Sequence, residues 1–472
     1  MKKKINIVLI FLLTAAIFHG CEDRSVLTGP TPQSPVSGSV DLSRYVAIGN
    51  SLTAGYQSSA LYMGAQAYAY PNLIAKQGGN GAFSQPLISE PGIGGKIKIV
   101  SLSPFVTAVE PSSGVPLFLT NPQPYNNLGI PGIVLADVMN SKTTATSYSK
   151  SPFIDIILRG KGTQFVQAKA QSPSLITLWI GNNDVLGFAT SGGVRPSSPT
   201  DANTFAFLFS QLADSLAATG AKVVVANIPD VTAIPFFTTV GPGIALKLSS
   251  LGINGMYYQA HGQYNGTALP ISSLANYSAL ITLVGQSYAS LIGTPTGKFY
   301  RDNKVDITLL IAGGILDTTK AFGLDPKNPW PDALILDPSE ITTAKNATAA
   351  FNTTISAVAG AKGFGLVNIN TMFNQIRAND ATGGTSFNGV TFTTTFVTGG
   401  LFSLDGVHPT NQGQAIIANE FLKVINSKFG STYPLIDVST IPGSLNLAKR
   451  VAINYMDINT YIDPDFYKHL FF

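Results

Sequence analysis

The sequence predicts an α/β protein with a parallel, doubly wound sheet. The chain has 472 residues, of which 45% are hydrophobic and 11% are charged, so it can bury a large core. Four short apolar runs, each bounded by turn residues, have the character of buried parallel strands: 44–48, 175–180, 223–228 and 365–369. Helical patterns lie between them, and such alternation is typical of a parallel sheet that is covered on both faces.

Each predicted element follows from a local pattern. The first strand runs into Ser51, which therefore lies at the carboxyl end of a strand, where open α/β sheets bind ligands. A helix is predicted over 339–361, because Pro338 precedes this stretch and Gly363 follows it. Two further helices are predicted from apolar residues that share one helical face: Phe205, Leu208, Phe209, Leu212 and Leu216 in the first, and Ile417, Phe421, Val424 and Ile425 in the second.

Two long stretches interrupt the alternation of strands and helices. Residues 56–126 are rich in Gly, Pro and Tyr and contain one possible strand at 96–102, whereas residues 232–336 mix Gly/Pro-rich loops with apolar runs. We interpret both as insertions into a single domain over 41–430, at the sheet edge that carries the site, because substrate selection usually resides in such loops. The second insertion could instead be a separate small domain. The tail, 431–472, has aromatic ends and no assigned role.

The first 20 residues have the pattern of an export signal. Lysines at positions 2–4 precede an apolar run over 5–18 that is too short to favour a membrane span. Gly20-Cys21 follows, and Cys21 is the only cysteine in the chain. This pair resembles the lipobox of bacterial lipoproteins, in which the cysteine becomes the lipidated N-terminus. The alternative is an ordinary signal peptide beside an unremarkable cysteine.

A lone cysteine here has no disulfide partner, so we expect Cys21 to carry a lipid that anchors an exported bacterial lipoprotein to a membrane. The outer membrane is the expected one, with the protein facing the periplasm or the cell surface. Residues 21–40 would then hold the lipidated cysteine and a flexible tether rich in Ser, Pro and Gly. Loss of the three signal lysines lowers the formal charge from +4 to +1, which argues against a nucleic-acid partner. We expect a monomer without a cofactor.

The scarcity of histidine points to a candidate base. Among the four histidines, His19 lies in the signal, His261 in the second insertion and His469 three residues from the C-terminus. Only His408 has both an aspartate at a short spacing, Asp405, and a proline directly behind it, and it lies in a loop that leads into a helix. There the carboxylate can accept the ring Nδ1–H while Nε2 faces a serine. A solvated or core histidine is the alternative. Scattered histidines without a His-Glu-x-x-His motif predict no metal centre.

Ser51 is the candidate nucleophile. At a strand-to-helix turn its hydroxyl would be exposed and its backbone N–H would point out of the helix start, although Ser51 could also be only a helix N-cap. Asn183 follows the buried strand at 175–180, and its amide could donate to an oxyanion unless it merely caps the strand end. The loop 127–132 has two glycines and could bring a backbone N–H close to the same oxygen.

These stretches together resemble the four blocks of the SGNH, or GDSL-type, hydrolases. The matching positions are Gly49-Asn50-Ser51-Leu52, Gly132, Asn183 and Asp405/His408. The resemblance implies a flavodoxin-like three-layer α/β/α sandwich. It also implies Ser51 as the nucleophile, His408 as the base and Asp405 as its orienting carboxylate. The implied oxyanion hole consists of the backbone N–H groups of Ser51 and Gly132 and the side chain of Asn183. Asn50 stands where the family has Asp, and so keeps the shape but loses the charge.

We therefore expect a serine esterase or lipase that forms an acyl-enzyme on Ser51. Its substrate would be a lipid, a small ester or an acylated glycan. An acyltransferase or a carbohydrate O-deacetylase could use the same site. A surface lipoprotein that binds glycan or lipid without turnover is a further alternative, of a different class.

Overall fold

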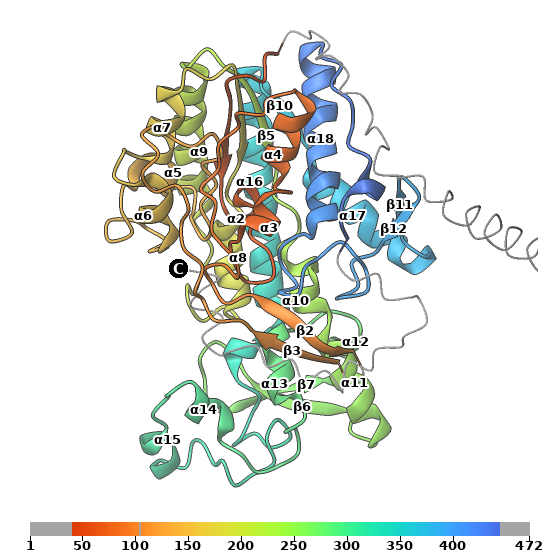
Figure 1. Cartoon of the computed structure of the whole chain (residues 1–472). Coiled ribbons are helices and arrows are strands. Elements are labelled where there is room, and N and C mark those ends of the chain that lie inside the picture. Colours follow the sequence, from red (N-terminus) through yellow and green to blue (C-terminus); the bar gives the residue numbers. More distant parts are fainter. Residues whose placement is uncertain (1–39, 103–104, 444–472) are drawn as a thin grey trace, which may run out of the picture. The chain divides into compact units, whose positions relative to one another are not determined.

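A four-stranded parallel sheet carries the predicted site (Figure 1). The computed structural model describes residues 40–102 and 105–443; the predicted export signal, Cys21, the tether before residue 40 and the end of the tail lie outside them. The strand order is β1-β4-β5-β10, and all neighbours are parallel. The four strands are β1 (Tyr45–Gly49), β4 (Leu175–Trp179), β5 (Lys222–Ala226) and β10 (Gly365–Val367). Each agrees with its predicted run to within two residues at either end.

Helices flank this sheet, which confirms the predicted α/β fold class (Figure 1). On one side α4 (Tyr70–Gln77) packs with α18 (Asn411–Phe429), where the rings of Tyr70 and Phe421 stack at 4.7 Å between centroids. A second pair consists of α9 (Ala202–Ala217) and α16 (Pro338–Lys362), where Phe205 and Phe351 stack at 4.0 Å. Buried aromatic rings therefore fix both helix pairs.

Local sequence signals explain where the long helices begin and end. Helix α16 begins with a capping box: the Asp337 side chain accepts the N–H of Glu340, and the Glu340 side chain accepts the N–H of Asp337. It ends at Gly363, which has a left-handed backbone. Helix α18 is capped by the Thr410 side chain, so the loop that carries His408 leads directly into it.

The first stretch that we interpreted as an insertion contains part of the helical layer. Helix α4 lies within 56–126, yet it packs against α18 over the sheet. The possible strand at 96–102 is confirmed as β2 (Ile97–Leu102), and it pairs in antiparallel fashion with β3 (Phe105–Val109), which the sequence did not indicate. Helix α4 and strand β3 have only eight and five residues, so neither is long enough to give a clear periodic pattern.

The second stretch, 232–336, forms an array of short helices and two-stranded sheets (Figure 1). Strand β8 (Leu280–Ile281) pairs with β9 (Ile335–Leu336), just before α16 begins. The other α-helices and strands of this stretch are α10 (Pro235–Thr238), α11 (Val240–Ser250), β6 (Gly255–Gln259), β7 (Gly266–Pro270), α12 (Ile271–Ala275), α13 (Gln286–Ala289), α14 (Lys298–Asp302) and α15 (Thr308–Ala312).

Short elements and loops complete the described part of the chain. Residues 431–443 run back along α18, where the Ile436 N–H donates to Asn419 Oδ1 at 2.7 Å. Within the described ranges, no helix has both the length and the apolar character needed to cross a bilayer. The remaining helices and strands are α2 (Ser51–Ala54), α3 (Met63–Gln66), α5 (Asp137–Asn140), α6 (Phe153–Leu158), α7 (Gln164–Ala170), α8 (Asn183–Thr190), α17 (Ile369–Asn379), β11 (Thr385–Phe387) and β12 (Val390–Phe392).

Candidate active site

The register of β1 and β4 brings two of the predicted site residues to one edge of the sheet. Gly49 pairs with Trp179 at the carboxyl ends of the two strands. Ser51 then begins α2 and Asn183 begins α8, so both start a helix just beyond the sheet. Parallel neighbouring strands end at the same edge, which is where ligands bind in this class of fold.

Asn50, and not Ser51, caps the helix after β1. The Asn50 side chain accepts the N–H of Leu52 at 3.1 Å and donates through Nδ2 to Asn182 Oδ1 at 3.1 Å. The alternative in which Ser51 serves as the N-cap therefore does not describe this turn. With the cap supplied by its neighbour, the Ser51 hydroxyl is available for another partner.

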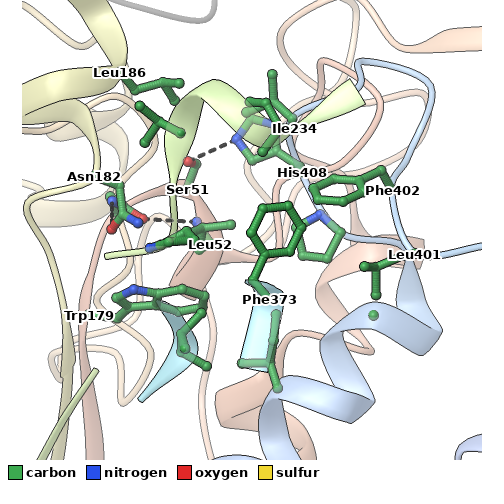
Figure 2. A pocket seen from close by; sticks show the side chains of 18 of the residues that line it. Ser51, Leu52, Trp179, Asn182, Leu186, Ile234, Phe373, Leu401, Phe402 and His408 are labelled. Atoms are coloured by element: carbon green, nitrogen blue, oxygen red, sulfur yellow. Dashed lines mark hydrogen bonds between the residues drawn. The ribbon is translucent and has the colours of Figure 1, made fainter. Parts of the chain in front are cut away.

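That partner is His408 (Figure 2). Its Nε2 lies 2.9 Å from Ser51 Oγ, and its Nδ1 lies 2.9 Å from Asp405 Oδ2. The structure thus brings Ser51 together with Asp405 and His408, although Ser51 and His408 lie 357 positions apart in the sequence. Their arrangement is the one that nucleophilic catalysis requires of a nucleophile, a base and a carboxylate that orients the base. All three side chains are buried.

The carboxylate of Asp405 is fully buried but well supplied with donors. Oδ1 accepts the N–H groups of Val407 at 2.9 Å and His408 at 2.8 Å, and the Ser403 hydroxyl at 3.0 Å. Oδ2 accepts the N–H of Ser59 at 3.0 Å besides facing the His408 ring. Burial raises the pKa of Asp405, but the adjacent His408 and these hydrogen bonds outweigh it and hold the pKa below its usual value. The carboxylate therefore stays ionised beside the ring.

Sequence reasoning missed several residues that position the Asp405–His408 pair. The Tyr56 ring lies 4.9 Å from the His408 ring, and its hydroxyl donates to the Ser59 carbonyl at 2.6 Å. Ser403 receives the N–H of Ser58 at 2.9 Å. These residues belong to no motif, because their contacts cross about 345 positions of sequence. Only the structure shows that the start of the stretch 56–126 supports the loop that carries His408.

The third predicted element, the oxyanion hole, is assembled around the loop 127–133. This loop runs beside β1, since Leu128 N–H donates to Ala47 O at 2.9 Å and Ile130 N–H to Gly49 O at 3.0 Å. Asn183 Nδ2 donates to the Ile133 carbonyl at 2.8 Å, which joins the loop to α8. One further N–H of that amide remains for a ligand.

Two backbone N–H groups complete this candidate set. Gly132 has φ +82°, a conformation that glycine adopts without strain. Among the described residues, none accepts a hydrogen bond from the N–H of Ser51 or of Gly132. Helix starts leave such groups available, and two free N–H groups with a side-chain amide are a suitable set for a developing oxyanion.

An apolar pocket opens beside Ser51 (Figure 2). Its empty volume is about 780 Å³, its open mouth included. Polar groups are confined to the end that holds Asn50, Ser51, Asn182, Asn183 and His408. The remaining wall is apolar and comes from α2, β4, α8, the segment between β5 and α10, α17, α18 and the loop that carries His408: Leu52, Trp179, Leu186, Pro229, Val231, Ile234, Ile369, Met372, Phe373, Ile376, Leu401, Phe402, Val407, Pro409, Gly413, Ile416 and Ile417. Such a pocket suits a hydrocarbon chain next to a polar reacting group.

The comparison with protein families agrees with this geometry. A model of the GDSL-like lipase/acylhydrolase family matches residues 45–421, which include every predicted site residue of the sheet edge. No curated protein and no solved structure matches the chain.

Replacing Asp405 with Asn should remove most ester turnover while the protein still folds. The amide oxygen can accept the N–H groups of Val407 and His408, but the amide NH₂ would face the His408 ring and the Ser59 N–H. We expect kcat to fall by about 10³–10⁴-fold, because His408 loses the acceptor that orients it, and the free energy of unfolding to fall by about 1–3 kcal/mol. Turnover of p-nitrophenyl butyrate and urea denaturation measure the two effects.

The control for this substitution is Asp214→Asn, on a carboxylate whose side chain is 63% exposed. It should change kcat less than twofold. An Asp405→Asn protein that keeps kcat within tenfold of the wild type would contradict the orienting role of Asp405.

Proposed function

The chain belongs to the GDSL-like lipase/acylhydrolase family, and from this premise we propose that it is a serine esterase that hydrolyses carboxylic esters through an acyl-enzyme on Ser51. One observation carries the proposal: hydrogen bonds run without interruption from Ser51 Oγ through His408 to the ionised Asp405. The family supports ester hydrolysis in general, and the geometry supports the role of each residue.

In the proposed acylation step, Ser51 Oγ attacks the ester carbonyl carbon and its proton passes to His408 Nε2. Asp405 holds the ring so that Nδ1 carries a proton and stabilises the imidazolium. The carbonyl oxygen becomes an oxyanion that faces the N–H groups of Ser51 and Gly132 and the amide of Asn183. Collapse of this intermediate breaks the ester C–O bond, and the leaving alcohol takes the proton from His408.

Deacylation repeats these steps with water in place of the serine hydroxyl. His408 removes a proton from the water, which attacks the acyl carbon, and the returning proton restores the Ser51 hydroxyl. The acid leaves, and the enzyme regains its starting state. No carboxylate beside the nucleophile takes part, so Asn50 can occupy the family's Asp position while it caps α2 and contacts Asn182.

The apolar pocket supports an ester with a hydrocarbon acyl chain as the substrate. Polar atoms lie only at the Ser51 end, and the wall beyond offers no partners for sugar hydroxyls. Burying hydrocarbon is worth about 0.8 kcal/mol per CH₂ group, so an apolar wall favours longer acyl chains by up to about fourfold per carbon. A glycan in this pocket would leave its hydroxyl groups without hydrogen bonds.

We further propose that the enzyme works at a membrane surface, to which a lipid on Cys21 anchors it. The single cysteine after an export signal supports this proposal. The following tether is long enough to let the domain reach lipid esters in the same membrane or soluble esters near it.

Ser51→Ala should abolish turnover and fluorophosphonate labelling together. Removal of the hydroxyl eliminates the nucleophile, so kcat should fall by at least about 10³-fold while the melting temperature stays near that of the wild type. Labelling followed by peptide mapping should place the probe on the peptide that contains Ser51. Ser278→Ala, on an exposed serine, should behave as wild type. Labelling of another residue in the wild type would defeat the proposal, and a wild type that binds lipid or glycan without labelling would indicate a binding protein.

Acyl-chain preference should respond to the pocket wall. For p-nitrophenyl esters of two to eight carbons, we expect kcat/KM to rise by roughly 2–4-fold per CH₂. Met372→Trp, on α17, should flatten this rise for the longest ester because it fills part of the apolar wall, and it should change the acetate value less than about twofold because acetate needs little of that wall. Asn374→Trp adds the same bulk on an exposed position of the same helix and should leave the profile unchanged. A flat wild-type profile would argue against an acyl pocket.

Cys21→Ala should separate the protein from the membrane. In a bacterial host that expresses the full chain, wild type should incorporate labelled palmitate and require detergent for extraction, because lipidated cysteine anchors it. The variant should lose the label, whereas Ser25→Ala in the tether should keep it. Palmitate incorporation that persists in Cys21→Ala would contradict the lipid-anchor proposal without bearing on the esterase site.

A further inference from the structure

Two hydrogen bonds in series fix the direction of the Asn182 side-chain amide at the polar end of the pocket. Asn50 Oδ1 accepts the backbone N–H of Leu52 at 3.1 Å, so the other end of that amide, Nδ2, is the donor toward Asn182. The atom that Asn50 Nδ2 reaches, 3.1 Å away, must be an acceptor, and it is Asn182 Oδ1. Because a backbone N–H can only donate, neither amide can be reversed without the loss of a bond.

This direction leaves the NH₂ group of Asn182 without a partner. Asn182 occupies the N-cap position of α8, yet its side chain does not cap the helix. Among the described residues, none accepts a hydrogen bond from Asn182 Nδ2. The residue is only 4% exposed, and it lines the pocket together with Ser51. A donor this deeply buried is costly to leave unpaired, and a ligand in the pocket would satisfy it.

The position of Asn182 relative to the catalytic pair indicates which ligand atom it meets. Figure 2 shows Ser51 between Asn182 and His408. The imidazole must reach both Ser51 Oγ and the leaving alcohol, so the carbonyl oxygen of a bound ester turns to the side away from His408. Asn183, the predicted side-chain donor to that oxygen, is the next residue along the chain and already donates one N–H to the Ile133 carbonyl.

We propose that Asn182 Nδ2 is a fourth donor to the oxyanion that forms when Ser51 attacks an ester. It would act with the N–H groups of Ser51 and Gly132 and the amide of Asn183, and Asn50 would hold it in the required direction. The proposal rests on the proposed esterase function. A donor that is oriented before the substrate binds needs no rearrangement as the negative charge develops, so it stabilises the transition state more than the bound ester.

The same hydrogen bonds give a role to asparagine at position 50, where the family has aspartate. A carboxylate there could accept the N–H of Leu52 but could not donate to Asn182 Oδ1. The Asn182 amide would then turn so that Nδ2 donates to the carboxylate, and Oδ1, with its partial negative charge, would face the pocket. Residue 50 therefore decides whether Asn182 offers the substrate a donor or an acceptor.

Two substitutions of Asn182 in the full-length protein test its role in turnover of p-nitrophenyl butyrate. Asn182→Ala removes the donor, so kcat should fall by roughly 10–100-fold while KM stays within about threefold. Asn182→Asp keeps an oxygen for Asn50 Nδ2 and replaces the donor with a carboxylate, so its kcat should fall further. Asn203→Ala, on an exposed position of α9, is the control and should keep kcat within twofold.

Asn50→Asp tests the orienting role through a double-mutant cycle. In the wild-type background this substitution should lower kcat by about tenfold or more, because it turns the Asn182 amide. In the Asn182→Ala background it should lower kcat by less than about threefold, because no amide remains to be turned. If the contact between Asn50 and Asn182 only supported the fold, Asn182→Asp, which preserves that contact, would retain wild-type kcat.

Three results would each overturn the proposal. The first is a kcat within threefold of the wild type in both Asn182 variants. The second is a raised KM with unchanged kcat, which would mean that the amide contacts only the bound ester. The third is an equal effect of Asn50→Asp in the two backgrounds. A wild type without ester turnover and without fluorophosphonate labelling would instead refute the esterase itself, so the two failures are distinguishable.

Discussion

The buried hydrogen bond between Asp405 and His408 imposes the main constraint on the active site. A carboxylate without solvent stays ionised only when donors surround it. Here the donors come from two distant segments: Ser59 from the stretch after α2, and Ser403 with Val407 and His408 from the loop before α18. The need to satisfy one charge therefore ties the first part of the chain to the last and sets the position of the imidazole.

The parallel register of β1 and β4 determines the other half of the site. Because Gly49 pairs with Trp179, the helices that begin at Ser51 and Asn183 start at the same edge of the sheet. The loop 127–133 forms backbone hydrogen bonds with β1 and accepts one from the side chain of Asn183, and these bonds hold Gly132 at that edge. Rigid strands thus position the nucleophile and the oxyanion donors, while a loop positions the base.

The sequence predicts the features that depend on local chemistry. Apolar runs located the four strands, and Pro338 with Gly363 located the ends of α16, because buried strands and helix caps have local signatures. Contacts between distant segments have no such signature. Three features depend on residues that lie far apart in sequence: the contacts of Tyr56 and Ser59 around His408, the packing of α4, and the cluster of His261 with Asp337 and Glu340. Only the tertiary structure reveals them.

Asp405 differs from a second group of buried carboxylates, Glu340 and Asp332 near the start of α16. Asp405 has a histidine at 2.9 Å and four further donors, and its pKa lies below the usual value. Glu340 accepts the N–H of Asp337 and Asp332 that of Gly262, the histidine beside Glu340 lies 3.7 Å away, and the pKa values of both carboxyl groups rise. Burial acts on both groups in the same direction, so the number and distance of the donors decide the outcome. A catalytic carboxylate is thus stabilised from within the chain, whereas the acidic group at α16 lacks a comparable internal partner.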